Sequence, residues 1–488
     1  MHRENTGGSK RQVRSTGSPW PGLAAAVWFV AAITAARVVM LALSQTDLWV
    51  DEAQYWLWGQ HPAFGYSSKP PLIGWVIGAV TAVLGDSPFA IRLPGPFLHG
   101  ATALLLGRLA QDLFRGRAGL WTTIGYVTLP MTALGSLLIS TDTILAPFLA
   151  AGLLWWMRAA AGAGARAAAL SGALVGLAVL GKYSALFFWP GALVLALASP
   201  AARPTARNWA VALAAFAAVV APNLAWNLSH DMATLSHTLD NAGWLQSGIS
   251  LDWTGALGFL ATQLAVMGPI LFPLLLLLPF RHPDPGQRAM LTFCMLVLAA
   301  ITGQALLSVA YGNWAVTAYL SGSVALLPWL ALRAPRLYWA SVAVNGTLCL
   351  AVPLLSLFPA ALSDAKGQPL LQRYLGRAAM ARAILTRAHE AGASAIVIDG
   401  RGLAAALFHE GRNSNIRLYA LAPSGAPASY YELTFPAPEN PAGRVLAVTR
   451  GAPLPCATDA RALDVAGTAW ARTHVYLQGY CTAGAEDP

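Results

Sequence analysis

The sequence predicts a polytopic α-helical membrane protein with a small soluble α/β domain at its C-terminus. Of its 488 residues, 56% are hydrophobic and only 11% are charged, and the mean hydropathy is +0.53. Apolar runs of membrane-spanning length follow one another up to about residue 358, where the composition changes to shorter, mixed segments. Most of the chain is therefore expected to lie in lipid.

Eleven apolar runs are predicted to cross the hydrocarbon core, which takes roughly 17 to 25 residues, although the shortest of them fall just below that length. They lie near residues 22–45, 92–113, 119–137, 143–158, 167–181, 184–199, 208–226, 255–280, 289–310, 314–332 and 337–358. We therefore predict three parts: a disordered cytoplasmic tail (1–21), a transmembrane domain (22–358) and a soluble domain outside the membrane (359–488). The run behind the basic tail is too long for the core of a signal peptide, so it is expected to be a retained helix.

One short apolar run decides the orientation of the chain. Residues 71–85, PLIGWVIGAVTAVLG, open on Pro70-Pro71. If this run spanned, the later basic loops would lie opposite the basic N-terminus. If it lies in the interface or re-enters, those loops join the N-terminus inside, as the positive-inside rule expects. We expect the second arrangement, with the N-terminus in the cytoplasm and with residues 46–91 and the C-terminal domain on the outer side. The net charge of +10 then reflects orientation rather than nucleic-acid binding.

The C-terminal block has the pattern of a small α/β domain. Two helical segments flank the strand-like SAIVID, and four further strand-like segments follow: IRLYAL, YYELTF, RVLAVT and HVYLQGY. Cys456 and Cys481 lie in this block, where an oxidising compartment permits a disulfide, whereas Cys294 and Cys349 lie inside apolar runs. The sequence contains no CxxC, Walker loop or GxSxG motif, so nucleotide hydrolysis and serine-hydrolase chemistry have no support.

The first outer loop, DLWVDEAQYWLWGQHPAFGYSSKPPLIGW, combines carboxylates with aromatic rings. On a helix, at about 100° per residue, Asp51, Tyr55 and Trp58 share one side, and Glu52 projects away from Asp51. The opposite side is an apolar stripe that would lie on the membrane surface, formed by Trp49, Ala53, Trp56 and Leu57. Two interpretations stay open: a carboxylate flanked by sugar-stacking rings, or acids that favour a helix N-terminus beside an interfacial aromatic belt.

Three further ionisable residues stand on the same predicted side of the membrane. Asp142, in STDTILAP, begins the fourth span, Lys182, in LGKYSALFF, lies between the fifth and sixth, and Lys69 lies in the first outer loop. Singly, Asp142 has an alternative role as a helix-capping acid after Ser140, and Lys182 as a snorkelling anchor. Ionisable groups near hydrocarbon are costly and are functional candidates. Together with Asp51 they favour one site on the outer side.

A resemblance to a known family rests on the order of four motifs: DLWVDEAQYW, GYSSKPPLIGW, SPFAIRLPGPFLHGATALLLGRLAQDLFRGRAG and STDTILAPF. With these motifs the chain, from about residue 24 to 330, resembles the GT-C membrane glycosyltransferases. It is most similar to the bacterial branch related to protein O-mannosyltransferases and lipid A aminoarabinose transferase. The resemblance implies a GT-C fold, a polyprenyl-phosphate-linked sugar donor and inversion at the anomeric carbon. It also implies an acceptor at the outer face, which is lipid A or another glycolipid, a polysaccharide or a protein.

The resemblance also implies residue roles. Asp51 corresponds to the family's essential first-loop aspartate, Asp142 to its second-loop acidic residue, and Lys69 to a basic residue near the donor phosphate. Aminoarabinose transferases of this kind have Glu directly before that lysine, where this chain has Ser68. This difference weakens any inference of a metal site or of the same sugar, so a divalent metal is left open.

Glycosyl transfer needs a base for the acceptor hydroxyl and positive charge where the phosphate leaves. The candidate bases, in order of preference, are Asp51, Asp142 and Glu52. The candidate cations for the donor phosphate are Lys69, Lys182 and Arg92. The candidates for substrate contact are Tyr55, Trp58, Tyr66, His230 and Asn313.

Other classes remain open at this point. A transporter or flippase would be expected to show inverted repeats and helices broken near mid-membrane, and the sequence has no convincing repeat. A ligase or polymerase of a different fold would use the same kind of donor. Only the motifs Asp51-Glu52 and Lys69-Pro70-Pro71 argue against that class. A catalytically inactive binding module is a further alternative, against which the joint presence of Asp51, Lys69 and Asp142 argues.

Overall fold

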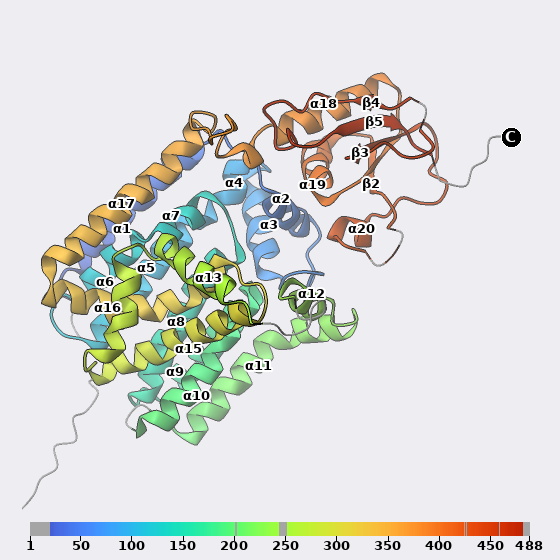
Figure 1. Cartoon of the computed structure of the whole chain (residues 1–488). Helices are drawn as coiled ribbons and strands as arrows, with labels where there is room; N and C mark the ends of the chain where they lie inside the picture. The colour runs from blue at the N-terminus through green and yellow to red at the C-terminus, as the bar shows by residue number, and fades with distance from the viewer. Residues whose placement is uncertain are drawn as a thin grey trace, which may run out of the picture.

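The computed structural model describes residues 20–200, 203–243, 251–423, 425, 427–457 and 459–481. In this part of the chain, a bundle of helices is followed by a smaller domain with a β-sheet, which sits at one end of the bundle (Figure 1). Nearly all of the predicted N-terminal tail, residues 1–19, lies outside the described residues.

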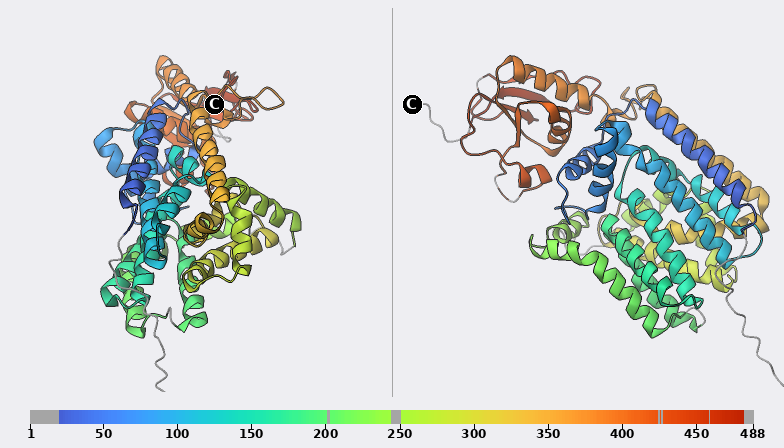
Figure 2. Two further views of the ribbon diagram at one scale, coloured as in Figure 1. Left: turned by 90° about the vertical axis from the view of Figure 1, so that its left-hand side faces the viewer. Right: turned by 180° about the vertical axis from the view of Figure 1, so that it is seen from behind.

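Eight helical segments of the described chain are long and apolar enough to cross a membrane. They are α1 (Leu23–Leu43), α4 with α5 (Pro88–Arg92 and Pro94–Leu113), α8 (Thr141–Ala160), α9 (Gly164–Gly181), α11 (Ala206–Leu228), α15 (Pro285–Leu307), η4 with α16 (Gly312–Ala315 and Val316–Arg333) and α17 (Pro335–Leu357). The first and last of these, α1 and α17, lie side by side in both Figure 1 and Figure 2. The first and last candidate spans of the bundle are therefore neighbours in space.

The other three predicted runs are also helical, but none is one long helix. Residues 184–199 form η1 (Tyr183–Phe187) and the short α10 (Phe188–Ala198). Residues 119–137 divide into α6 (Ala118–Val127) and α7 (Pro130–Leu137). Pro130 cannot continue α6, and the buried Arg37 of α1 donates to the carbonyl of Val127 at 2.7 Å, which satisfies the backbone at the break.

The predicted span 255–280 is sharply bent. It forms α13 (Trp253–Val266), α14 (Leu271–Leu277) and η3 (Leu278–Phe280), with an angle of 119° across the break. Gly268 takes a positive φ of 105° there, and Asn345 donates to the carbonyl of Met267 at 3.2 Å. Counted as one span, this pair raises the eight candidates of the described chain to nine.

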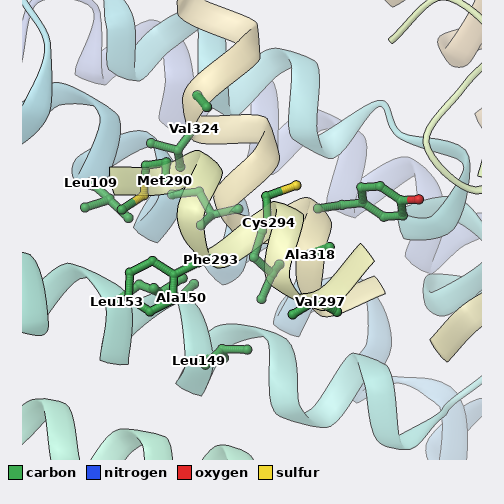
Figure 3. Close-up of a cluster of buried hydrophobic side chains, with 14 of the residues drawn as sticks. Leu109, Leu149, Ala150, Leu153, Met290, Phe293, Cys294, Val297, Ala318 and Val324 are labelled. Carbon is green, nitrogen blue, oxygen red and sulfur yellow. The ribbon is translucent and has the colours of Figure 1, made fainter. Parts of the chain in front are cut away.

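Most of the bundle is held by one large apolar core. Figure 3 shows part of it, where side chains from α5, α8, α15 and α16 meet around Cys294 and Phe293. α16 is the most central of the candidate spans, with 83% of its most apolar stretch buried, whereas α11 has 11%. The outer surface of α11 is therefore left for lipid.

Two short helices separate the bundle from the C-terminal domain. α2 (Val50–Gln60) is followed by α3 (Leu72–Leu84), and the two pack with Gly59 against Gly78, where a side chain on either glycine would meet backbone atoms (Figure 1). The 13 residues of α3 extend about 20 Å at about 1.5 Å per residue, shorter than a hydrocarbon core of about 30 Å. The run 71–85 is thus too short to span.

The predicted apolar stripe of residues 49–57 on the membrane surface is wrong. α2 packs against α3 on one side and against a helix of the C-terminal domain on another, so Glu52 and Gln54 are as buried as Trp56. Only the two ends of this helix are accessible. The apolar residues belong to a core shared by two parts of the protein, which a helix considered by itself does not reveal.

The C-terminal domain is built on a five-stranded sheet in the order β2-β1-β3-β5-β4. Its elements are η5 (Gln372–Tyr374), α18 (Arg377–Glu390), β1 (Ala395–Ile398), α19 (Arg401–Glu410), η6 (Gly411–Asn413), β2 (Arg417–Ala420), α20 (Tyr430–Thr434), β3 (Val445–Arg450), β4 (Arg461–Ala462) and β5 (Val475–Gly479). β1 pairs in parallel with β2 and β3, and β5 runs antiparallel to β3. Outside this domain, the short helix α12 (Ala233–Asn241) follows α11.

Four of the five predicted strands are present, but the predicted strand YYELTF is wrong because this segment forms helix α20. Ser429 caps the helix by accepting from the Glu432 backbone amide at 3.4 Å, and Glu432 reaches back to the Ala428 amide at 2.7 Å. This reciprocal capping outweighs the β propensity of the aromatic residues. The short strand β4 had not been predicted.

The structure joins Cys456 to Cys481 by a disulfide across 25 residues of the C-terminal domain. We expect the double variant Cys456→Ser/Cys481→Ser to lose about 2 to 4 kcal/mol of domain stability, because the closed loop restricts the unfolded chain. Denaturant unfolding of purified protein, oxidised and reduced, measures the difference. Free thiols at both positions in oxidised protein would contradict this pairing.

Candidate active site

The buried acid Glu52 organises the start of α2. Its carboxylate forms a forked ion pair with Arg92 of α4, with Nε to Oε1 at 2.9 Å and Nη2 to Oε2 at 2.7 Å, and both side chains are about 98% buried or more. Oε2 also accepts from the Trp49 amide at 2.9 Å, which caps the helix. Arg92 in turn donates to the Asp47 carbonyl at 2.8 Å.

The same carboxylate connects two loops that are far apart in the sequence. Glu52 Oε1 accepts from the backbone amide of Ile139 at 3.0 Å, just before helix α8 begins. Glu52 and Arg92 therefore satisfy each other and the backbone around them. This geometry leaves neither side chain free for the roles predicted from the sequence, Glu52 as a reserve base and Arg92 as a phosphate ligand, since removing either partner would strand a buried charge.

Asp142 is the acidic residue that this link brings close to α2. It lies in the first turn of α8, behind the capping Ser140. Lys182 Nζ approaches both of its oxygens, at 2.7 and 2.9 Å, and Asn313 Nδ2 donates to Oδ2 at 2.9 Å. Three predicted site residues from three separate segments thus meet at one carboxylate.

Lys69 lies in the loop between α2 and α3. Side chains of α11 and α12 hold this loop by its backbone: Asn223 donates to the Phe64 carbonyl and Thr234 to the Tyr66 carbonyl, each at 2.7 Å. Burial lowers the pKa of Lys69, and the charge of Lys182 lowers it further, while Asp51 and Asp142 act in the opposite direction. Lys69 therefore lies within electrostatic reach of the other predicted charged residues.

Asp51 stands beside this cluster in the first turn of α2. Its side chain is 43% exposed, in contrast to the buried Glu52 that follows it. Its partner is Arg401 of α19, which also donates from Nε to Gln54 Oε1 at 2.8 Å. The cluster of Asp51, Lys69, Asp142, Lys182, Asn313 and Arg401 is called the charged site below.

The predicted aromatic contacts divide into two kinds. Trp58 is fully buried and stacks on Tyr66 at a ring distance of 4.4 Å, and the Tyr66 hydroxyl donates to the Trp58 carbonyl at 2.8 Å. Because both rings are buried in this packing, neither has a free face for a sugar, so the interpretation of these two residues as sugar-stacking surfaces does not fit the structure. Tyr55 lies closer to the charges: burial raises its pKa, and Asp51 and Asp142 raise it further.

His230 is not part of the charged site in this structure. It lies just after α11, where its ring stacks on Trp226 at 4.1 Å and Nδ1 lies 2.8 Å from the Trp226 carbonyl. Another histidine, His237 of α12, lies nearer: burial lowers its pKa, and the charges of Lys69 and Arg401 lower it further.

Sequence reasoning did not find Arg401. It begins α19 directly after β1 and Gly400, about 350 positions from Asp51, and no spacing or motif connects the two. The only available signal was general: polar residues at the start of a helix that follows a strand often contribute to sites.

The described residues contain no group of three or more His, Cys, Asp or Glu side chains that could hold a metal ion. In the charged site, both carboxylates have cationic partners: Asp51 pairs with Arg401, and Asp142 with Lys182. The arrangement thus presents two acids and three basic side chains.

Fold and site together define a polytopic membrane enzyme with a charged centre between its helical bundle and a soluble domain. Residues 68–226 match the family described as dolichyl-phosphate-mannose-protein mannosyltransferase. Over 447 residues the chain is 42% identical to lipid A galacturonosyltransferase RgtD of Rhizobium johnstonii, covering 91% of this chain and 93% of that protein. The chain therefore belongs to the GT-C family of membrane glycosyltransferases, as its motifs had predicted.

Solved structures confirm the fold. The chain is similar to ArnT from Cupriavidus metallidurans in the apo state, with a TM-score of 0.61 at 13% identity over 93% of this chain and 98% of that one. The same protein bound to undecaprenyl phosphate matches with a TM-score of 0.51 at 16% identity, over 80% of this chain and 76% of that one. The chain is a membrane glycosyltransferase, and the transporter, the inactive binding module and the ligase of another fold are set aside.

We expect Glu52→Gln to destabilise the protein by about 3 to 5 kcal/mol, because it leaves the Arg92 guanidinium buried without its counter-charge. Thermal and denaturant unfolding in detergent measure the change. Arg382→Gln is a control, since Arg382 is 63% exposed and its ion pair with Glu410 is at the surface on that side, so its loss should cost about 0 to 1 kcal/mol. Equal, small effects of both variants would show that Glu52 does not hold the loops together.

Proposed function

We propose that this glycosyltransferase moves a sugar from a polyprenyl-phosphate donor to lipid A, at the periplasmic face of a bacterial inner membrane. The observation that carries the proposal is the charged site, in which acids and bases from separate loops meet at the membrane-domain end that the C-terminal domain covers. Two comparisons support the substrate classes: the relative RgtD is named for transfer to lipid A, and ArnT has been solved with undecaprenyl phosphate.

Asp51 is the base in this proposal. Its side chain is half-exposed and has one cationic partner, whereas Asp142 is held on both oxygens by Lys182 and Asn313. A carboxylate must reach the acceptor hydroxyl to take its proton, and Asp51 has the freer oxygen. In this proposal the acceptor oxygen bonds to the anomeric carbon, the carbon–oxygen bond to phosphate breaks, and the proton passes to Asp51.

Lys69 and Lys182 stabilise the departing phosphate. A polyprenyl phosphodiester carries a negative charge in the donor and gains more as the phosphate leaves. The charged site has one more basic than acidic side chain, and the described residues include no ion-pair partner for Lys69. Burial, which lowers the pKa of Lys69, is offset when an anionic phosphate arrives next to it. Asn313 then orients Asp142, and Tyr55 remains neutral as a hydrogen-bond donor.

We expect Asp51→Asn to lower turnover by about 100- to 10,000-fold while the protein stays folded and binds its lipid donor. Asparagine keeps the shape of the side chain but cannot accept the proton, so the loss appears in kcat rather than in binding. The measurement is mass spectrometry of lipid A from a strain that lacks the gene and carries each variant, together with turnover of purified enzyme.

Lys69→Ala provides the contrast, because removal of a phosphate counter-charge should weaken donor binding first. If Asp51→Asn kept near-normal turnover, the base would have to be Asp142. Unchanged lipid A in the strain that lacks the gene would refute the proposed acceptor, and full activity of Asp51, Asp142 and Glu52 variants together would refute the catalytic assignment.

The proposed orientation places both termini of the α2–α3 region and the C-terminal domain in the periplasm. We expect a single cysteine placed in residues 85–90, and another in 359–365, to react with a membrane-impermeant thiol reagent from outside, since α3 is too short to span. Labelling of intact and lysed spheroplasts measures this. Reaction of 85–90 from the cytoplasm alone would reverse the side assigned to every later loop.

A further inference from the structure

The C-terminal domain contributes one side chain to the charged site, Arg401. It is the first residue of α19, and α19 packs directly on α2. Its Nη2 pairs with Asp51 Oδ1, and its Nε donates to Gln54 Oε1 at 2.8 Å. Gln54 is 2% exposed, so the guanidinium is held from a buried anchor one turn of helix away from the carboxylate.

Arg401 is the only hydrogen-bond or ion-pair partner of Asp51 within the described part of the chain. Glu52 and Asp142, by contrast, are each held by several donors. A half-exposed carboxylate with no partner turns freely among its rotamers. The direction in which Asp51 points is therefore set by a residue of another domain.

Two further contacts place Arg401 rigidly over α2. Asp47 Oδ2 accepts from the Arg377 backbone amide at 2.7 Å, at the start of α18. At the other end of α2, His409 Nε2 lies 2.9 Å from the Asp86 carbonyl, and its ring packs edge-on against Trp56 at 4.8 Å. α19, which carries both Arg401 and His409, is thus fixed along the length of α2.

We propose that Arg401 is a positioning residue for glycosyl transfer, through which the C-terminal domain holds Asp51 in its reactive orientation. The inference rests on the role of Asp51 proposed above. On this basis the C-terminal domain supplies a residue that the active site needs, and it is not a separate binding module.

The physical argument rests on geometry. A carboxylate that must meet a hydroxyl in one direction loses rate when it is free to turn, and a misplacement of about 1 Å can cost about 100-fold. Loss of Arg401 should therefore lower kcat and leave the KM for the lipid donor nearly unchanged.

The experiment compares Arg401→Gln, Arg401→Lys and the control Arg382→Gln in purified full-length enzyme. Arg382 lies on the neighbouring α18, is 63% exposed and forms an ion pair with Glu410 at 2.9 Å. We expect Arg401→Gln to lower kcat roughly 10- to 100-fold, with little change in KM for the lipid donor. Arg401→Lys keeps the charge without the forked guanidinium, so it should restore part of kcat. Arg382→Gln should match the wild type.

Several outcomes would overturn the inference. Normal kcat in Arg401→Gln would exclude a positioning role. A rise in KM alone would make Arg401 a substrate ligand instead. If Arg401→Gln fails to fold, Arg401→Lys still decides, because a lysine variant with normal folding and wild-type kcat shows that the forked contact is dispensable.

The two proposals fail separately. An active Asp51→Asn would refute the catalytic role of Asp51 and, with it, the need to position that residue. An inactive Asp51→Asn beside a fully active Arg401→Gln would refute only the role of Arg401.

Discussion

The buried ion pair between Glu52 and Arg92 is the constraint on which the site depends. It lies in a region from which water is excluded, and it also satisfies backbone groups of Trp49, Asp47 and Ile139. A buried charge pair contributes little net stability compared with apolar packing, but it tolerates only one arrangement of its partners. Here that arrangement places the start of α2 against the loop before α8, and so brings Asp51 and Asp142 to the same end of the bundle.

The two aspartates then differ because of what surrounds them. Asp142 is held by Lys182 and Asn313, which come from the ends of other membrane helices. Asp51 pairs instead with Arg401 of the C-terminal domain. One carboxylate is thus part of the membrane bundle and the other is part of an interface between domains. This difference in restraint separates their proposed roles more clearly than their sequence contexts do.

Much of this organisation could be predicted from the sequence, because hydrophobic length and motif order are local properties. The helical class, the positions of the apolar runs, four strands, and the placing of Asp142 and Lys182 on one side of the membrane required only patterns along the chain. The contact of Asn313 with Asp142 was not predicted. The breaks at Pro130 and Gly268 were missed, since hydropathy does not report where a buried side chain such as Arg37 or Asn345 replaces a helical hydrogen bond.

The errors at the site have a common cause. Four residues have the chemistry of functional side chains but are buried in structural contacts. Glu52 and Arg92 pair with each other across a long stretch of sequence, and Trp58 and Tyr66 stack on each other. Arg401 was missed for the reverse reason, because its partner lies in another domain. Both kinds of error come from long-range contacts, and one sequence without homologues contains no record of them.

The contact between Gly59 and Gly78 has a mechanical consequence. With backbone against backbone at this point, α2 and α3 cannot slide or roll over each other without a clash, and the other end of α2 is fixed by Glu52. The two helices therefore form a rigid unit that is fixed both at the Gly59–Gly78 contact and at Glu52. The eleven-residue connection between the two helices is therefore anchored at both of its ends, and side chains of α11 and α12 hold its backbone as well, so Lys69 meets a substrate from a fixed frame.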